Sequence, residues 1–159
     1  MKSPVLLLIA GVLAFPLLLQ AAPANHDHGA SAHHKLELNA GRKWDTDAAL
    51  RKGMTAIGTL VGGALPAAHA GKLTPAKYDA LANDVNAQIT YIVQNCKLDP
   101  KADAQLHIVI GDIAKGVETM QGKHPGKGRS SGVVEISQAV NTYGEYFNHP
   151  GWRAVKLPH

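Results

Sequence analysis

The chain contains a single cysteine, Cys96, among its 159 residues. It therefore cannot form an internal disulfide, and its stability must come from a hydrophobic core. Aromatic residues make up only 5% of the chain, and no block of Lys or Arg occurs, although the formal net charge is +4. Nucleic-acid binding usually needs a concentrated basic patch, so we expect no nucleic-acid partner.

The sequence also lacks the motifs of common catalytic sites. It has no Cys-x-x-Cys-His for covalent haem, no His-Glu-x-x-His, no Gly-x-Ser-x-Gly and no phosphate-binding loop. The acidic residues are spread singly, and none forms the Glu-x-x-His pairs of di-iron helical bundles. We therefore expect a protein that is not an enzyme.

Only one long hydrophobic run is present, and it lies at the N-terminus. The first 24 residues combine Lys2, an uncharged apolar run over residues 5–19 and the small residues Ala22 and Ala24. This order is typical of a secretory signal peptide, and the run is short for a membrane span of ~20 residues. We expect cleavage after Ala24, because a cut after Ala22 would place Pro23 beside the scissile bond. The mature protein is then periplasmic or secreted, with no membrane span.

Histidine is concentrated directly after the expected cleavage site. The stretch "NHDHGASAHHK", residues 25–35, contains His26, His28, His33 and His34, four of the nine histidines. Residues 25–43 lack a sustained apolar period, so they are predicted to form a flexible arm with a free α-amino group at its start. Neutral imidazoles suit Cu(II), Ni(II) and Zn(II), so the arm is predicted to bind metal ions.

Four segments with helical spacing of apolar residues follow the arm. The first helix is expected to begin after Asp45 or Thr46 as N-cap and to end at Gly62-Gly63. The second is expected to run from Thr74 and Pro75 to about Cys96, and the third from Asp99 and Pro100 to Gly122. The fourth is expected over about residues 131–147. Short loops favour an all-α, antiparallel up-down-up-down four-helix bundle over residues 44–152, followed by a tail, 153–159.

The expected core positions share a spacing of three or four residues within each segment. They are Leu50, Met54, Ile57 and Val61; Tyr78, Leu81, Val85, Ile89 and Ile92; Leu106, Val109, Ile110, Ile113, Val117 and Met120; and Val133, Ile136, Val140, Tyr143 and Phe147.

This topology is expected to place four possible metal ligands toward one end of the bundle: Met54, Cys96, His107 and His149. A thioether, a thiol and two imidazoles are ligands of copper or of haem iron. At ~1.5 Å rise per residue, Met54 and His107 lie deeper than Cys96 and His149, so the four form two layers. Each also has a purely structural interpretation: a core methionine, an inert thiol, a half-exposed histidine and a helix cap. A second, softer metal site and this structural alternative both stay open.

Three stretches, "RKWDTDAALRKGM", "YIVQNCKLDPKADAQLHIVIGDIAKGVETM" and "TYGEYFNHPGW", resemble a family of small exported bacterial proteins often labelled "DnrO protein". The resemblance covers about residues 42–152 and implies an exported helical protein with no established activity. A second likeness, in architecture alone, is to four-helix b-type cytochromes, which use an early Met and a late His. Met54 and His149 hold comparable places, but His149 lies past the helix end, so haem is not expected.

The leading hypothesis is a non-enzymatic periplasmic protein that binds or buffers Cu, Ni or Zn. The rival is a protein-interaction or chaperone-like module of the cell envelope without a ligand, with an exposed apolar patch around Tyr146 and Trp152. The third is a b-type haem protein.

Overall fold

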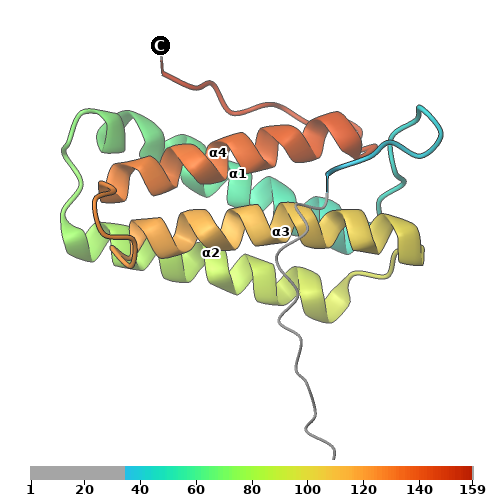
Figure 1. Ribbon diagram of the computed structural model, residues 1–159, viewed down its shortest axis with the longest axis horizontal. Helices are drawn as coiled ribbons and strands as arrows, with labels where there is room; N and C mark the ends of the chain where they lie inside the picture. Colours follow the sequence, from blue (N-terminus) through green and yellow to red (C-terminus); the bar gives the residue numbers. More distant parts are fainter. Residues whose placement is uncertain (1–34, 159) are drawn as a thin grey trace, which may run out of the picture. The chain divides into compact units, whose positions relative to one another are not determined.

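A computed structural model of the chain describes residues 35–158. These residues form four helices, α1 (Ala48–His69), α2 (Pro75–Asn95), α3 (Pro100–Met120) and α4 (Arg129–Tyr146), which pack around one core (Figure 1). The predicted all-helical, four-helix character is confirmed. The expected signal peptide and the histidines at positions 26–34 lie outside the described residues.

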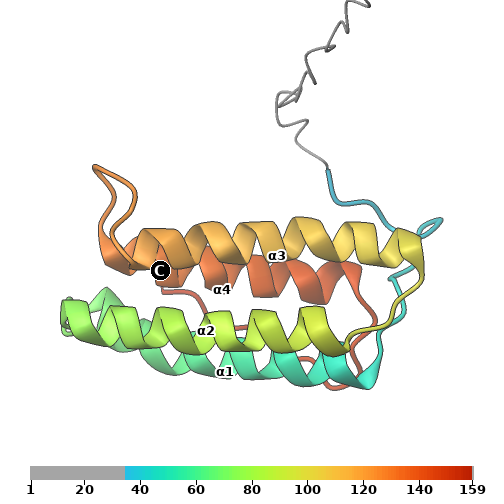
Figure 2. The same ribbon diagram turned by 90° about the horizontal axis from the view of Figure 1, so that it is seen from below.

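The helices are arranged so that each packs against two others. The contact between α3 and α4 is the most extensive, α1 packs on α2 and α4, and α2 also contacts α3. Figure 2 shows the α1–α2 and α3–α4 loops at one end and the α2–α3 loop at the other. Within residues 35–158, no helix has both the length and the apolar character needed to cross a membrane.

The starts of α2 and α3 are confirmed as predicted. The Thr74 side chain accepts a hydrogen bond from the backbone N–H of Lys77, and Pro75 opens α2. Asp99 caps α3 in the same way, ahead of Pro100. Proline suits the first helical position because that position has no intrahelical use for an N–H.

The N-cap of α1 differs from the prediction. Asp47, rather than Asp45 or Thr46, accepts a hydrogen bond from the backbone N–H of Leu50 at 2.7 Å. Its second carboxylate oxygen accepts from the backbone N–H of Lys97 at 2.6 Å. Asp47 therefore satisfies two free donors at once and ties the start of α1 to the α2–α3 loop, a tertiary contact that sequence spacing does not show.

The predicted end of α1 at Gly62-Gly63 was wrong, because the helix continues to His69. Leu65 and Ala68 follow Val61 on the same buried stripe, and each is at most 3% exposed. Glycine costs about 1 kcal/mol per residue in a helix interior, and the burial of a leucine side chain exceeds that cost.

The expected core positions are buried, except for Ile89 and Ile110, which are half-buried. The backbones of α3 and α4 approach closely at two glycines, where a Cβ on Gly132 would lie 2.4 Å from the carbonyl oxygen of Gly116. Only a residue without a side chain fits at such a crossing.

The segment before α1 is ordered further back than predicted. The sequence predicted a flexible arm to residue 43, but the backbone N–H of Glu37 donates to Gln105 on α3 at 2.7 Å. Trp44 is buried, its indole N–H donates to the Glu37 carbonyl, and its backbone bonds to Tyr146 and Asn148. Burial of one large aromatic residue offsets the ordering of its neighbours.

The C-terminal segment, residues 148–158, runs back along the bundle from the end of α4 (Figure 1). Asn141 on α4 fixes it by two hydrogen bonds to the backbone of Val155, at 2.7 and 2.9 Å. Trp152 lies against Gly144, where a Cβ would be 2.2 Å from the indole nitrogen.

Candidate functional site

The four residues predicted to form a softer metal site occupy separate environments. Met54 is fully buried, in the hydrophobic core. Its thioether is therefore surrounded by packed side chains, as in the structural interpretation of this residue.

His149 sits at the bundle end among aromatic rings from α4 and the C-terminal segment. Its Nδ1 lies 3.0 Å from the hydroxyl of Tyr143, and its Nε2 lies 3.4 Å from Oγ1 of Thr55. Its ring centroid is 5.8 Å from that of Tyr143 and 5.0 Å from that of Trp152. Both ring nitrogens thus have partners within the protein, and neither points free toward a ligand.

The protonation states of this pair follow from burial. Burial lowers the pKa of His149, and the nearby charge of Arg51 lowers it further. Burial raises the pKa of Tyr143 above its usual value. The tyrosine therefore stays protonated and donates to Nδ1 of a neutral His149, which leaves the Nε2 proton for Thr55.

Cys96 is half-buried directly after α2. Burial raises the pKa of its thiol to about 12, with further contributions from the charges of Asp47 and Asp103. The thiol is thus protonated at neutral pH, and a metal ion would have to displace that proton to bind.

His107 lies on the exposed side of α3 and is held by its own helix. Its Nδ1 is 2.9 Å from the backbone carbonyl of Asp103 and 3.4 Å from a carboxylate oxygen of the same residue. Within residues 35–158, no group of three or more His, Cys, Asp or Glu side chains is placed to hold a metal ion. Cys96, His107 and His149 are therefore not brought together around one point.

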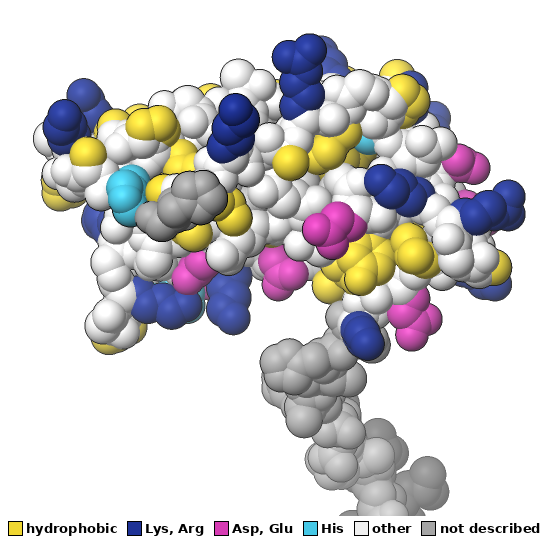
Figure 3. Space-filling model, turned by 90° about the horizontal axis from the view of Figure 1, so that it is seen from above, with side chains coloured by type: hydrophobic (Ala, Val, Ile, Leu, Met, Phe, Trp, Pro, Cys, Tyr) yellow, Lys and Arg dark blue, Asp and Glu magenta, His cyan; other side chains and the backbone are white. Residues whose placement is uncertain are grey.

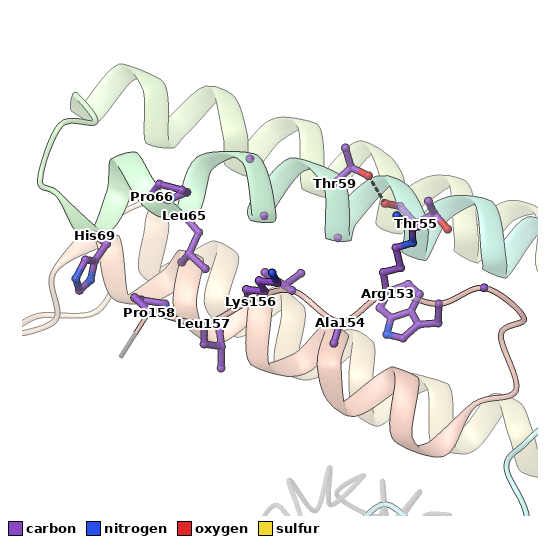
Figure 4. Close-up of a pocket in the computed structure, with 16 residues that line it drawn as sticks. Thr55, Thr59, Leu65, Pro66, His69, Arg153, Ala154, Lys156, Leu157 and Pro158 are labelled. Carbon is purple, nitrogen blue, oxygen red and sulfur yellow. Dashed lines mark hydrogen bonds between the residues drawn. The ribbon is translucent and has the colours of Figure 1, made fainter.

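The described residues instead contain a groove that sequence reasoning missed. It lies between α1 and the C-terminal segment and has a volume of about 850 Å³ (Figure 4). Figure 3 shows the face that carries this segment, where Lys and Arg side chains stand among hydrophobic patches. The one usable sequence signal is the repeated glycine in "GTLVGGALP", residues 58–66, because three of the positions on the groove side of α1 then have no side chain.

Comparisons of the chain with protein-family models, with curated proteins and with solved structures found no match. The resemblances noted from the sequence therefore stay predictions.

Proposed function

We propose that this chain is an exported, non-enzymatic protein that binds transition metal ions through its histidine-rich arm. The observation that carries the proposal is the density of imidazoles in residues 25–35, where His26, His28, His33 and His34 fall within nine residues. Imidazole binds Cu(II), Ni(II) and Zn(II), and an arm of this kind selects weakly among them. The signal-like first 24 residues support export to the periplasm, with cleavage after Ala24.

The contacts of the bundle favour the arm over the bundle end as the metal-binding segment. Metal binding at Nδ1 of His149 would displace its bond from Tyr143, binding at Nε2 would displace its contact with Thr55, and binding at Cys96 would remove a proton from a thiol of pKa about 12. Metal binding at the arm histidines would disturb none of these bundle contacts. The bundle, which we infer to follow up-down-up-down order from its alternating loop ends, acts in this proposal as the folded support of the arm.

Calorimetric titration tests the proposal with Cu(II) and Zn(II) on the mature chain, residues 25–159. Replacing the four arm histidines by Asn should lower the apparent affinity at least about tenfold, because each lost imidazole removes one ligand. The matched control replaces the exposed His69 and His107 by Asn and should leave binding unchanged. Equal affinity in the arm variant and wild type would refute the proposal, and loss in the control alone would place the site on the bundle.

The groove favours a second candidate, the interaction module. Trp152 and Leu157 line it and are half-buried rather than enclosed. The exposed apolar patch expected around Tyr146 and Trp152 is not found, because both side chains are half-buried and pack against the core. Partly exposed apolar side chains that line a groove nevertheless often mark a place where another molecule binds. This candidate predicts that Cys96→Ser and His107→Ala change stability alone and leave every binding activity intact.

A further inference from the structure

The groove along α1 has the size and shape of a ligand site. Its volume of about 850 Å³ falls in the range of ~300–1,000 Å³ found for small-molecule pockets. On one side it is lined by α1 from Thr55 to His69, a helical distance of roughly 21 Å. On the other side it is lined by residues 151–158. A site that follows a helix over such a distance suits an elongated ligand better than a compact one.

Three glycines form part of the α1 wall of the groove, between the side chains of residues such as Thr59 and Leu65, and we call this part the glycine wall. A Cβ on Gly58 or Gly62 would only touch Trp152 or Val155, at 3.6 and 3.7 Å, and a Cβ on Gly63 would meet nothing within 4 Å. The opposite wall is held in place from behind, because Asn141 bonds to the backbone of Val155. The groove is thus preformed.

The lining combines an apolar surface with positive charge. Leu65, Val155 and Leu157 are apolar and half-buried or buried, and no Asp or Glu of the described residues 35–158 lines the groove. Arg153 and Lys156 also line it, are exposed, and make no ion pair with any residue between 35 and 158. In Figure 4, Arg153 extends from the C-terminal segment toward α1. These two cationic side chains and the apolar part of the groove are complementary to a molecule that has one anionic group and a hydrocarbon chain.

We propose that this groove binds a single-chain anionic amphiphile, such as a fatty acid. The hydrocarbon chain lies along α1 beside Gly63, where the groove is open, and over Leu65 and Leu157. The carboxylate lies between α1 and the C-terminal segment, where Arg153 and Lys156 line the groove and bond to it. None of the arm histidines is part of this proposed site, and the proposal does not depend on metal binding.

Displacement of a fluorescent fatty acid tests this proposal directly. The full mature chain is titrated in EDTA with 11-(dansylamino)undecanoic acid, and the bound probe is displaced with laurate, 1-dodecanol or dodecyltrimethylammonium. We expect saturable binding, with laurate the strongest competitor. The double variant Arg153→Gln, Lys156→Gln should weaken laurate binding roughly tenfold and leave dodecanol unchanged, since each partly exposed charge contributes a few-fold in affinity.

Two matched pairs of variants locate the site. Gly63→Phe places a ring in the groove where the structure has open space, and should abolish binding; Gly111→Phe, on an exposed face of α3 that is equally open, should not. Lys97→Gln with Lys101→Gln, at exposed positions outside the groove, is the control for the charge variant.

Three results would overturn the proposal. They are no saturable binding of the probe, binding that survives Gly63→Phe, or equal competition by the neutral and cationic chains. Sedimentation of the protein without ligand can give a fourth such result. A dimer that dissociates in Gly63→Phe would mean that a second copy of the chain occupies the groove.

Discussion

Gly132→Ala should destabilise the protein, although alanine is a better helix former than glycine. The new Cβ would lie 2.4 Å from the Gly116 carbonyl oxygen and 2.5 Å from the backbone nitrogen of Met120. Ordinary contacts need about 3.4 Å or more, so α3 and α4 must separate locally by about 1 Å, which weakens dispersion contacts along the interface. Backbone atoms cannot rotate away as a flexible side chain would.

The magnitude follows from two opposed terms. Overpacking costs about 1–3 kcal/mol, here at the upper end, and the gain in helix propensity is at most about 1 kcal/mol. We expect a net loss of about 2 kcal/mol in the free energy of unfolding. With a urea m-value of about 1–3 kcal/mol/M, the midpoint falls by roughly 1 M at an unchanged slope.

The matched control is Gly111→Ala, in the middle of α3, where a Cβ meets nothing within 4 Å. It should stabilise by about 0.5–1 kcal/mol through propensity alone. Urea unfolding followed by far-UV circular dichroism measures both variants. If Gly132→Ala shifts the midpoint upward as Gly111→Ala does, the close approach of α3 and α4 is not a constraint on the sequence and the reasoning fails.

Three further predictions concern the bundle end. Gly144→Ala should displace Trp152, because the new Cβ would lie 2.2 Å from the indole nitrogen. The displaced ring should show a red shift and increased quenching of tryptophan emission. An unchanged spectrum would contradict the prediction. The free energy of unfolding should fall as pH drops below about 6.5. The pKa of His149 is lower in the folded than in the unfolded chain, so the unfolded chain binds the proton first and is stabilised by it. Urea unfolding at pH 7.5 and 5 should show a smaller change in the free energy of unfolding in His149→Asn than in wild type. Cys96 should react with iodoacetamide at pH 8 at least about tenfold more slowly in the folded than in the urea-unfolded chain. Its pKa is raised to about 12 from 9.0, and the smaller thiolate fraction outweighs the greater nucleophilicity of that thiolate. Equal rates would refute the burial of the thiol.

The sequence predicted the fold where local signals act alone. Thr74-Pro75 and Asp99-Pro100 specify helix starts by backbone chemistry within four residues, and both are found where predicted. The buried stripes follow from the helical period by itself. The N-cap of α1 was misplaced by up to two residues because Asp47 is selected by a bond to Lys97, fifty residues away in the chain.

The candidate site was less predictable, because it depends on where chain segments meet. Helix order and residue depth predicted that Cys96, His107 and His149 lie toward one end of the bundle. The rotation of each helix about its own axis decides what a side chain contacts, and helix order does not show that rotation. His107 is turned outward against Asp103, whereas His149 is turned inward against Tyr143. The groove depends on the path of residues 151–158, which have no period to read and which Asn141 fixes from a distance.

The glycines on the groove side of α1, among them the Gly62-Gly63 pair that was expected to end the helix, have a different physical consequence. Gly58, Gly62 and Gly63 each cost up to about 1 kcal/mol relative to Ala in a helix, yet a Cβ at none of them would clash. Packing of the described residues therefore does not require them, in contrast to Gly132, where only glycine fits. Replacing all three by Ala should stabilise the bundle by roughly 1.5–3 kcal/mol and, by adding three methyl groups to the groove wall, weaken binding of the dansyl fatty acid. Stabilisation without any loss of binding would mean that the glycine wall does not define the ligand site.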